Sequence, residues 1–315
     1  MLRIISNRHK YEWIEMNSFD IEKYFPYPLC AALGRAFSVF GDSVREIGIK
    51  RSGFLSLNVG GKNVFPDASA RLDGDRLRVS DEVFDECFMR ACEYSVYAYA
   101  SRIREGFIPL EGGHRVGVCG SAVGAGGRVL CVKNISSLDY RIARAFRGCA
   151  EQGIGYIADA RRIKNTVVAS RPGCGKTTFL RDAVRLLSDR GFRVCIVDTR
   201  SEIAAVKNGV AGFDVGALTS VFDGYPKSAG TENAVRAFSP DAVVCDEIGN
   251  EEELSSLRFL MARGVPFIVS VHCLGAEDLM KNKVLSALVR ENLAETVIFL
   301  DDVPFPTHIK EVLML

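Results

Sequence analysis

Short apolar runs alternate with longer amphipathic segments along the second half of the chain. Each apolar run has the length of a strand, and each amphipathic segment has the spacing of a helix. The predicted strands are 166–170, 193–198, 242–245, 266–271 and 296–300. The predicted helices are 151–163, 177–189, 231–238, 251–263 and 276–290. Because the strands are apolar on both faces and separated by helices, they predict a parallel sheet covered on both sides. Residues 151–315 are therefore predicted to form one α/β domain.

The first half of the chain lacks this regular alternation and mixes helical with strand-like patterns. Helices are expected over 29–40 and 81–104, and strands over 46–50, 54–59, 116–120 and 128–132. Ser80 is a suitable N-cap for the second helix, and Gly106 follows its end. The last two strands flank a glycine-rich stretch and predict a hairpin. Residues 1–150 are therefore predicted to form a smaller α+β domain that precedes the α/β domain.

The first predicted strand of the α/β domain leads into Ser-Arg-Pro-Gly-Cys-Gly-Lys-Thr-Thr at 170–178, and a helix follows. This order is that of a phosphate-binding loop, in which backbone N–H groups and a helix N-terminus face one anion. Ser170 departs from the strict motif, because it takes the place of the first glycine. The residues expected to bind nucleotide are Gly173, Cys174, Gly175, Lys176, Thr177 and Thr178. The pattern predicts a RecA-like P-loop NTPase domain.

The residue types in this loop suit Mg-ATP. Gly173 and Gly175 let the main chain approach phosphate oxygens, and Lys176 is expected to reach the β- and γ-phosphates. The Thr177 hydroxyl is expected to bind Mg²⁺ at the start of the helix. The α/β half contains no Lys-x-Asp motif of the kind that reads guanine, which favours ATP over GTP.

Hydrolysis also needs a carboxylate near Mg²⁺ and a group that positions water. Asp246 and Glu247 follow an apolar strand, and ligand sites of parallel sheets lie at the carboxyl ends of strands. Asp246 suits the second shell of Mg²⁺, and Glu247 suits water activation. Glu202 is a competing candidate for the water, and the sequence leaves this choice open. His272 ends another strand and either senses the γ-phosphate or has a structural role.

Composition narrows the class of protein. The 315 residues are 48% hydrophobic, which is enough for two cores, and 40 basic against 39 acidic residues leave a net charge of +1. This balance argues against nucleic acid as a partner. The ten cysteines contain no C-x-x-C pair and suit a reducing compartment. No apolar run approaches the ~20 residues that span a bilayer. We expect a soluble, cytoplasmic protein that attaches to a membrane only through a partner.

Several of these motifs together resemble the stage III sporulation protein AA family, which is similar to the ATPases of type II and type IV secretion. The most specific pair is Arg-Ser-Glu-Ile-Ala at 200–204 and Asp-Glu-Ile-Gly at 246–249. The other matching segments are 115–120, 135–138, 141–144, 172–178, 239–241 and 271–272. The chain departs from the family pattern at Thr199, where glutamate is expected, at Asn250, where arginine is expected, and at Cys273, where glycine is expected.

The resemblance implies a cytosolic, hexameric ATPase attached to a secretion-like membrane complex between the mother cell and the forespore. It also implies an acidic-box role for Asp198 and Glu202 and a Walker B role for Asp246 and Glu247. His272 would be the histidine-box residue. Two arginines, Arg141 and Arg144, match a segment that supplies arginines to nucleotide in related ATPases, and an ordinary ion-pair role is the alternative for them.

Two functional hypotheses from different classes follow. In the first, the chain is a motor subunit in which ATP hydrolysis drives the first domain against the second. In the second, ATP binding assembles the chain and hydrolysis is negligible, which the three departures from the family pattern favour. A third possibility, a nucleic-acid translocase, is disfavoured by the near-neutral charge and by the lack of a groove with interleaved basic and aromatic residues.

Overall fold

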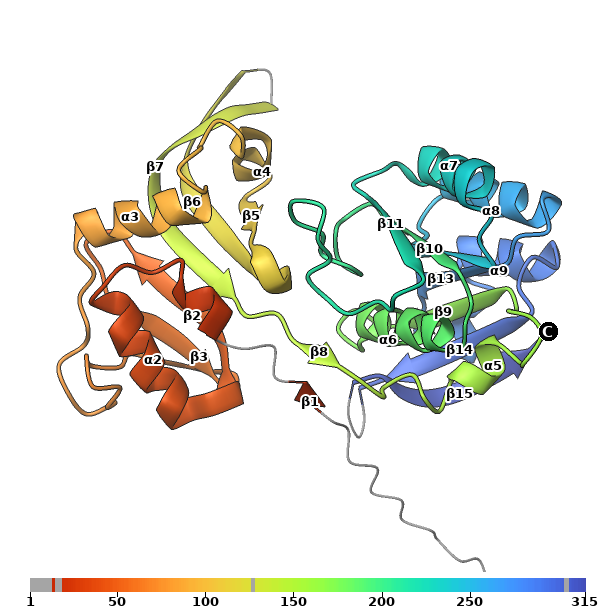
Figure 1. Ribbon diagram of the computed structural model, residues 1–315, viewed down its shortest axis with the longest axis horizontal. Coiled ribbons are helices and arrows are strands. Elements are labelled where there is room, and N and C mark those ends of the chain that lie inside the picture. The colour runs from red at the N-terminus through yellow and green to blue at the C-terminus, as the bar shows by residue number, and fades with distance from the viewer. Residues whose placement is uncertain (1–12, 15–18, 126–127, 303–305) are drawn as a thin grey trace, which may run out of the picture. The chain divides into compact units, whose positions relative to one another are not determined.

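The computed structural model describes residues 13–14, 19–125, 128–302 and 306–315. The chain divides into two compact units, with the boundary between Arg144 and Ala145 (Figure 1). The N-terminal unit ends at Arg144, and the C-terminal unit runs from Ala145 to Leu315. Strand β1 (Trp13–Ile14) belongs to the C-terminal unit, where it pairs antiparallel with β8 (Ala145–Phe146).

The N-terminal unit contains a six-stranded sheet in which every neighbouring pair is antiparallel. In sheet order the strands are β4 (Lys62–Val64), β3 (Ser56–Val59), β2 (Val44–Lys50), β7 (Arg128–Arg141), β6 (Arg115–Ala125) and β5 (Phe107–Pro109). The helices are α1 (Phe19–Glu22), α2 (Leu29–Phe40), α3 (Asp81–Ala91) and α4 (Ala100–Arg104), with short 3-10 turns η1 (Gly41–Ser43) and η2 (Glu111–Gly113). The hairpin expected here is β6 and β7, and its glycines Gly126 and Gly127 lie outside the described residues.

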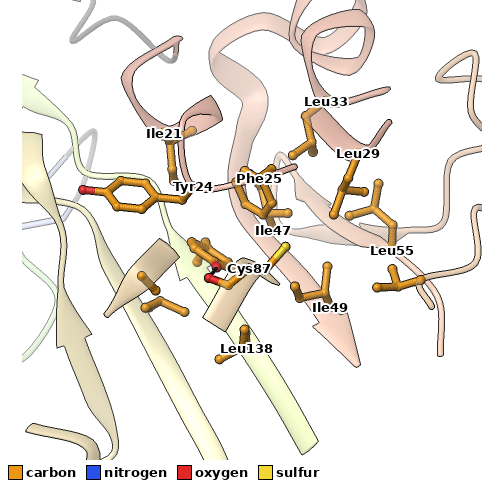
Figure 2. Packing of buried hydrophobic residues seen from close by; sticks show 14 of the residues in the cluster. Ile21, Tyr24, Phe25, Leu29, Leu33, Ile47, Ile49, Leu55, Cys87 and Leu138 are labelled. Atoms are coloured by element: carbon orange, nitrogen blue, oxygen red, sulfur yellow. Dashed lines mark hydrogen bonds between the residues drawn. The ribbon is translucent and has the colours of Figure 1, made fainter. Parts of the chain in front are cut away.

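The core of this unit lies between the sheet and its helices. Figure 2 shows Leu29 and Leu33 of α2 beside Ile47 and Ile49 of β2, all of them buried. The helix expected over 81–104 is wrong in its length, because α3 ends at Ala91. The next residues include Glu93 and Tyr94 in the left-handed region, with φ of 49° and 58°, and an α-helix cannot continue through that conformation.

The C-terminal unit contains a seven-stranded, mostly parallel sheet. In sheet order the strands are β11 (Thr219–Asp223), β10 (Val194–Asp198), β12 (Ala242–Glu247), β13 (Phe267–His272), β9 (Thr166–Ser170), β14 (Thr296–Asp301) and β15 (His308–Met314). Only β15 is antiparallel to its neighbour. The helices are α5 (Ile154–Ile157), α6 (Lys176–Asp189), α7 (Lys227–Phe238), α8 (Glu251–Ala262) and α9 (Lys283–Arg290). The sequence missed both edge strands, β11 and β15.

Alternate residues of the central strands enter two separate cores, which confirms that helices cover both faces of this sheet. Val167 and Ala169 of β9 pack with residues of α7, α8 and α9, whereas Val168 packs with residues of α5 and α6. This is the alternation that a pleated strand imposes on its side chains. The predicted α/β class is therefore correct for this half of the chain.

Three predicted helices of this unit have different bounds. The segment 151–163 forms only the short α5, because Ala158 leaves the helix and pairs with Ile163 in an isolated bridge. The segment 276–290 is divided into a 3-10 turn, η3 (Ala276–Asp278), and α9, which begins after the capping side chain of Asn282. Helix α7 begins at Lys227 rather than at residue 231, and this earlier start matters for the site.

Candidate active site

The carboxyl ends of β9, β10, β12 and β13 meet at one edge of the C-terminal sheet, because these strands are neighbours and parallel. A pocket of about 370 Å³ lies there. Its lining residues are Pro172, Gly173, Gly175, Lys176, Thr177, Thr178, Arg200, Glu202, Asp246, Glu247, Ser270 and His272. The sequence singled out nine of these residues as site residues. Parallel strand order therefore gathers segments that are far apart in the chain into one polar pocket.

The turn between β9 and α6 needs both of its glycines for their backbone conformation, and Gly175 also for lack of space. Gly173 and Gly175 have φ of 84° and 86°, in the left-handed region that favours glycine. A Cβ on Gly175 would lie 2.6 Å from Thr307 Cγ2, whereas a Cβ on Gly173 would have open space. Ser170 needs no such freedom, because it is still in β9, in register with His272. The missing first glycine of the motif is thereby accommodated.

Cys174 lies in this turn but not in the lining of the pocket. Its residue is only 2% exposed, and its carbonyl oxygen accepts a hydrogen bond from the Thr307 N–H at 2.9 Å. All ten cysteines of the chain are free thiols. The side chain of Cys174 is therefore placed for packing, and only its main chain belongs to the turn that faces the pocket.

Lys176 is the buried cation of the loop. Its Nζ lies 3.2 Å from the Ser170 carbonyl oxygen, 3.3 Å from the Arg171 carbonyl oxygen and 2.8 Å from His272 Nδ1. Burial lowers the pKa of this ammonium, and the nearby Glu247 carboxylate opposes the shift. The ammonium therefore rests on weak, neutral acceptors that a phosphate oxygen can replace.

A row of side chains connects this lysine to the predicted water-activating carboxylate. Because an ammonium has no acceptor, it donates to His272 Nδ1, which leaves the imidazole proton on Nε2. His272 Nε2 lies 3.2 Å from Glu247 Oε2, and Arg200 lies 3.6 Å from the same oxygen. Glu247 thus lies within ion-pair distance of two nitrogen-bearing side chains, one at the end of β13 and one just after β10. Arg200 was not assigned a role from the sequence, although it opens the Arg-Ser-Glu-Ile-Ala motif.

The other acidic residue assigned from the resemblance, Asp198, does not line the pocket. Its carboxylate is fully buried and accepts the backbone N–H groups of Glu202, Ile203 and Ala204 at 2.8, 3.0 and 2.9 Å. Burial raises the pKa of Asp198, and these backbone hydrogen bonds oppose the shift. Arg181 donates to the carbonyl oxygens of Glu202 and Ile203 from the other side. Asp198 therefore shapes the loop that presents Glu202 to the pocket.

Asp246 is buried and pairs with a lysine that sequence reasoning missed. Lys227 Nζ lies 2.7 Å from Asp246 Oδ1 and 2.7 Å from Glu253 Oε1. Burial raises the pKa of Asp246, and Lys227 opposes that rise. The sequence carried only a weak signal for this contact, a lysine directly after Pro226, since the predicted helix began four residues later.

The donor set fits a nucleotide with Mg²⁺. The N-terminus of the 14-residue helix α6 and Lys176 offer N–H donors to phosphate, and the Thr177 hydroxyl is an oxygen ligand suited to Mg²⁺. Asp246 lines the same pocket and is buried, with Lys227 on its Oδ1. A buried carboxylate oxygen of this kind is suited to a cation or to its coordinated water.

The two arginines Arg141 and Arg144 lie in the N-terminal unit, and each has a partner there. Arg141 forms an ion pair with Glu46 at 3.0 Å, and Arg144 donates to the Val44 carbonyl oxygen at 2.8 Å.

Among the described residues, no helix is both long enough and apolar enough to cross a membrane.

Comparisons with known proteins place these observations in a family. The family model described as "Sporulation stage III, protein AA" matches residues 63–313. The Stage III sporulation protein AA of Bacillus subtilis (strain 168) is 33% identical over 228 residues, which cover 71% of this chain and 74% of that protein. The uncharacterized protein ycf45 of Cyanidium caldarium is 32% identical over 175 residues, covering 51% of this chain and 49% of that protein.

Two solved structures resemble the fold, and their low identities make the likeness one of fold alone. The Legionella pneumophila ATPase DotB gives a TM-score of 0.55 at 17% identity, covering 87% of this chain and 76% of that chain. The pilus retraction motor PilT with bound ADP gives a TM-score of 0.52 at 12% identity, covering 85% of this chain and 76% of that chain. The predicted similarity to secretion ATPases is confirmed at this level. Because the family model spans most of the chain and the Bacillus subtilis protein matches over most of its length, the chain belongs to the stage III sporulation protein AA family.

Proposed function

We propose that the C-terminal unit is a RecA-like P-loop domain that binds Mg-ATP in the pocket at the sheet edge and hydrolyses it. The observation that carries this proposal is the convergence of Lys176, Asp246, Glu247 and His272 on that one pocket. The ADP in the PilT structure, which has a similar fold, supports a nucleotide as the ligand.

The phosphate groups bind at the turn before α6. The turn and the first residues of α6 line the pocket, so their N–H groups are suited to donate to phosphate oxygens. Lys176 exchanges its carbonyl and imidazole partners for β- and γ-phosphate oxygens. Thr177 and Asp246 would hold Mg²⁺, and the bound ion would neutralise charge on the phosphate oxygens. Gly173, Gly175 and Thr178 complete the wall against the phosphates.

Hydrolysis requires a base or a positioning group for water. The oxygen of a water molecule bonds to the γ-phosphorus, the bond to the β–γ bridging oxygen breaks, and ADP leaves with the electron pair. Glu247 orients that water and takes its proton, since it already faces His272 and Arg200 in the pocket. His272 responds to the γ-phosphate, because it shares Lys176 with the loop. Glu202 also lines the pocket and is the alternative carboxylate.

The chain acts as a motor subunit of a sporulation-associated, secretion-like membrane complex. Family membership supports the sporulation setting. The fold shared with the pilus retraction motor PilT and the ATPase DotB supports the motor role. A hexamer, a cytoplasmic location and membrane-protein partners are further parts of this proposal. No nucleic acid is expected as a partner.

A second candidate function is a subunit that assembles on binding ATP and hydrolyses almost none of it. Asn250 favours it, because it caps α8 by accepting the Glu253 N–H at 2.9 Å, where the family pattern has an arginine. The position therefore brings no positive charge toward the γ-phosphate, and a lost charge there weakens transition-state stabilisation.

The experiment that separates the two functions uses Glu247→Gln. This substitution keeps the shape of the side chain and removes its charge, so ATP binding and assembly should persist. A motor loses sporulation activity in this variant, whereas an assembly subunit keeps it. If DNA or RNA stimulated phosphate release from the wild-type protein, that result would instead support a nucleic-acid translocase.

A further inference from the structure

Lys227 occupies an unusual position for a lysine. It is the first residue of α7, where the helix dipole disfavours a cation, and it is only 7% exposed. Lysines are seldom buried unless they are paired. The two carboxylates of Asp246 and Glu253, both 2.7 Å from its Nζ, offset these costs. Burial lowers the pKa of the ammonium, but the hydrogen bonds that the ammonium donates to both carboxylates outweigh burial and raise it.

The two carboxylates come from opposite ends of the segment that contains Glu247. Asp246 directly precedes Glu247, at the end of β12. Glu253 lies in the first turn of α8, and its other oxygen, Oε2, accepts the Gly249 N–H at 2.7 Å. A closed ring of contacts therefore runs from Asp246 through Lys227 and Glu253 to Gly249, and Glu247 lies on the segment that the ring encloses.

The segment from Asp246 to Gly249 needs a restraint that the sheet does not supply. Cys245 is in register with Val269 of β13, but the next pair is Glu247 with Ser270, so Asp246 is an extra residue in the ladder. Such irregularities re-aim side chains next to functional sites and interrupt regular pairing. Beyond the bulge, one backbone bond from the Ile248 N–H to the Ser270 carbonyl oxygen at 2.9 Å remains.

We propose that Lys227 is a positioning residue for Glu247, because its ammonium joins Asp246 to Glu253 and so fixes the bulged segment with Glu247 facing His272. The consequence for catalysis rests on the proposed function, since it concerns the same site. The restraint on the segment itself does not, because every contact in the ring joins residues of this chain.

Two variants break the ring at different places. Glu253→Ala removes the link to Gly249 and keeps the buried pair of Lys227 with Asp246, so the fold should persist. Lys227→Met removes the ammonium and leaves Asp246 unpaired. The matched control is Lys283→Met, because Lys283 is also the first residue of a helix, α9, but is exposed.

The first readout is hydrogen exchange of the nucleotide-free protein, followed in the peptide 246–253. We expect the Gly249 amide to exchange on the order of ten times faster in Glu253→Ala and in Lys227→Met, and unchanged in Lys283→Met. The double variant should exchange no faster than the single variants, since all of them open the same ring. Unchanged exchange in Glu253→Ala would overturn the proposal, even if Lys227→Met does not fold.

The second readout is ATP hydrolysis. We expect kcat to fall on the order of ten-fold in Glu253→Ala with KM for ATP nearly unchanged, since a misplaced catalytic group costs turnover rather than binding. Equal kcat in Glu253→Ala and Lys283→Met would contradict the positioning role. A wild-type protein that neither binds nor hydrolyses ATP would refute the proposed function instead, and the exchange experiment would still decide whether the ring restrains the segment.

Discussion

Gly175→Ala tests how tightly the phosphate loop is packed, with Gly173→Ala as its matched control. Both glycines have nearly the same positive φ, so an added Cβ causes a similar backbone cost of about 1–2 kcal/mol at each position. The two sites differ in space, because a Cβ at Gly175 would lie 2.6 Å from Thr307 Cγ2 and 3.2 Å from the Thr307 backbone nitrogen. Overpacking of this kind costs about 1–3 kcal/mol in addition.

The lower entropy of the unfolded alanine chain offsets about 0.4–1 kcal/mol in both variants. We therefore expect Gly173→Ala to destabilise the C-terminal unit by about 1 kcal/mol and Gly175→Ala by about 2–4 kcal/mol. Urea unfolding followed by circular dichroism measures both free energies of unfolding. Equal destabilisation of the two variants would refute the reasoning, because it would mean that Thr307 does not pack against the loop.

Three further predictions concern the site. Lys176→Ala should abolish ATP binding in titration calorimetry, because the other cation of the loop, Arg171, pairs with Asp301 and Asp302 and does not line the pocket. Retained affinity would mean that the site is wrongly assigned. Asp198→Ala should lower the free energy of unfolding by about 3–5 kcal/mol in a denaturant titration, since it leaves three backbone N–H groups, two of them buried, without their acceptor. A loss below about 1 kcal/mol would contradict its role in shaping the loop. Glu247→Gln should reduce kcat about 10²–10⁴-fold with ATP binding retained, and a larger loss in Glu202→Gln would assign the water to Glu202 instead.

The sequence predicted the central strands well because each is apolar on both faces, and burial on both faces gives a strong local pattern. It missed β11 and β15 at the edges of the sheet, since β11 is half-buried throughout and β15 has no fully buried residue. It also merged α3 and α4 into one helix. The break depends on the left-handed backbone of Glu93 and Tyr94, which neither residue type signals strongly.

The site residues that were predicted stand in local sequence motifs, whereas those that were missed depend on contacts made only in the folded chain. Lys176 and Asp246 stand in motifs whose order along the chain follows from the chemistry of phosphate and metal binding. Lys227 stands in no such motif, because its partners Asp246 and Glu253 become neighbours only when α7 packs beside β12 and α8. Asp198 was placed at the correct edge, yet its hydrogen bonds to the following loop are a property of the folded backbone.

Phosphate release from the purified protein with Mg-ATP, measured beside Lys176→Ala over a range of protein concentrations, tests the central claim most directly. We predict that the wild-type protein turns over ATP, that Lys176→Ala does not, and that turnover per subunit rises with concentration if sites are completed between subunits. Equal phosphate release from the two proteins, or none from wild type at any concentration, would contradict the assignment of this pocket as an ATP hydrolysis site.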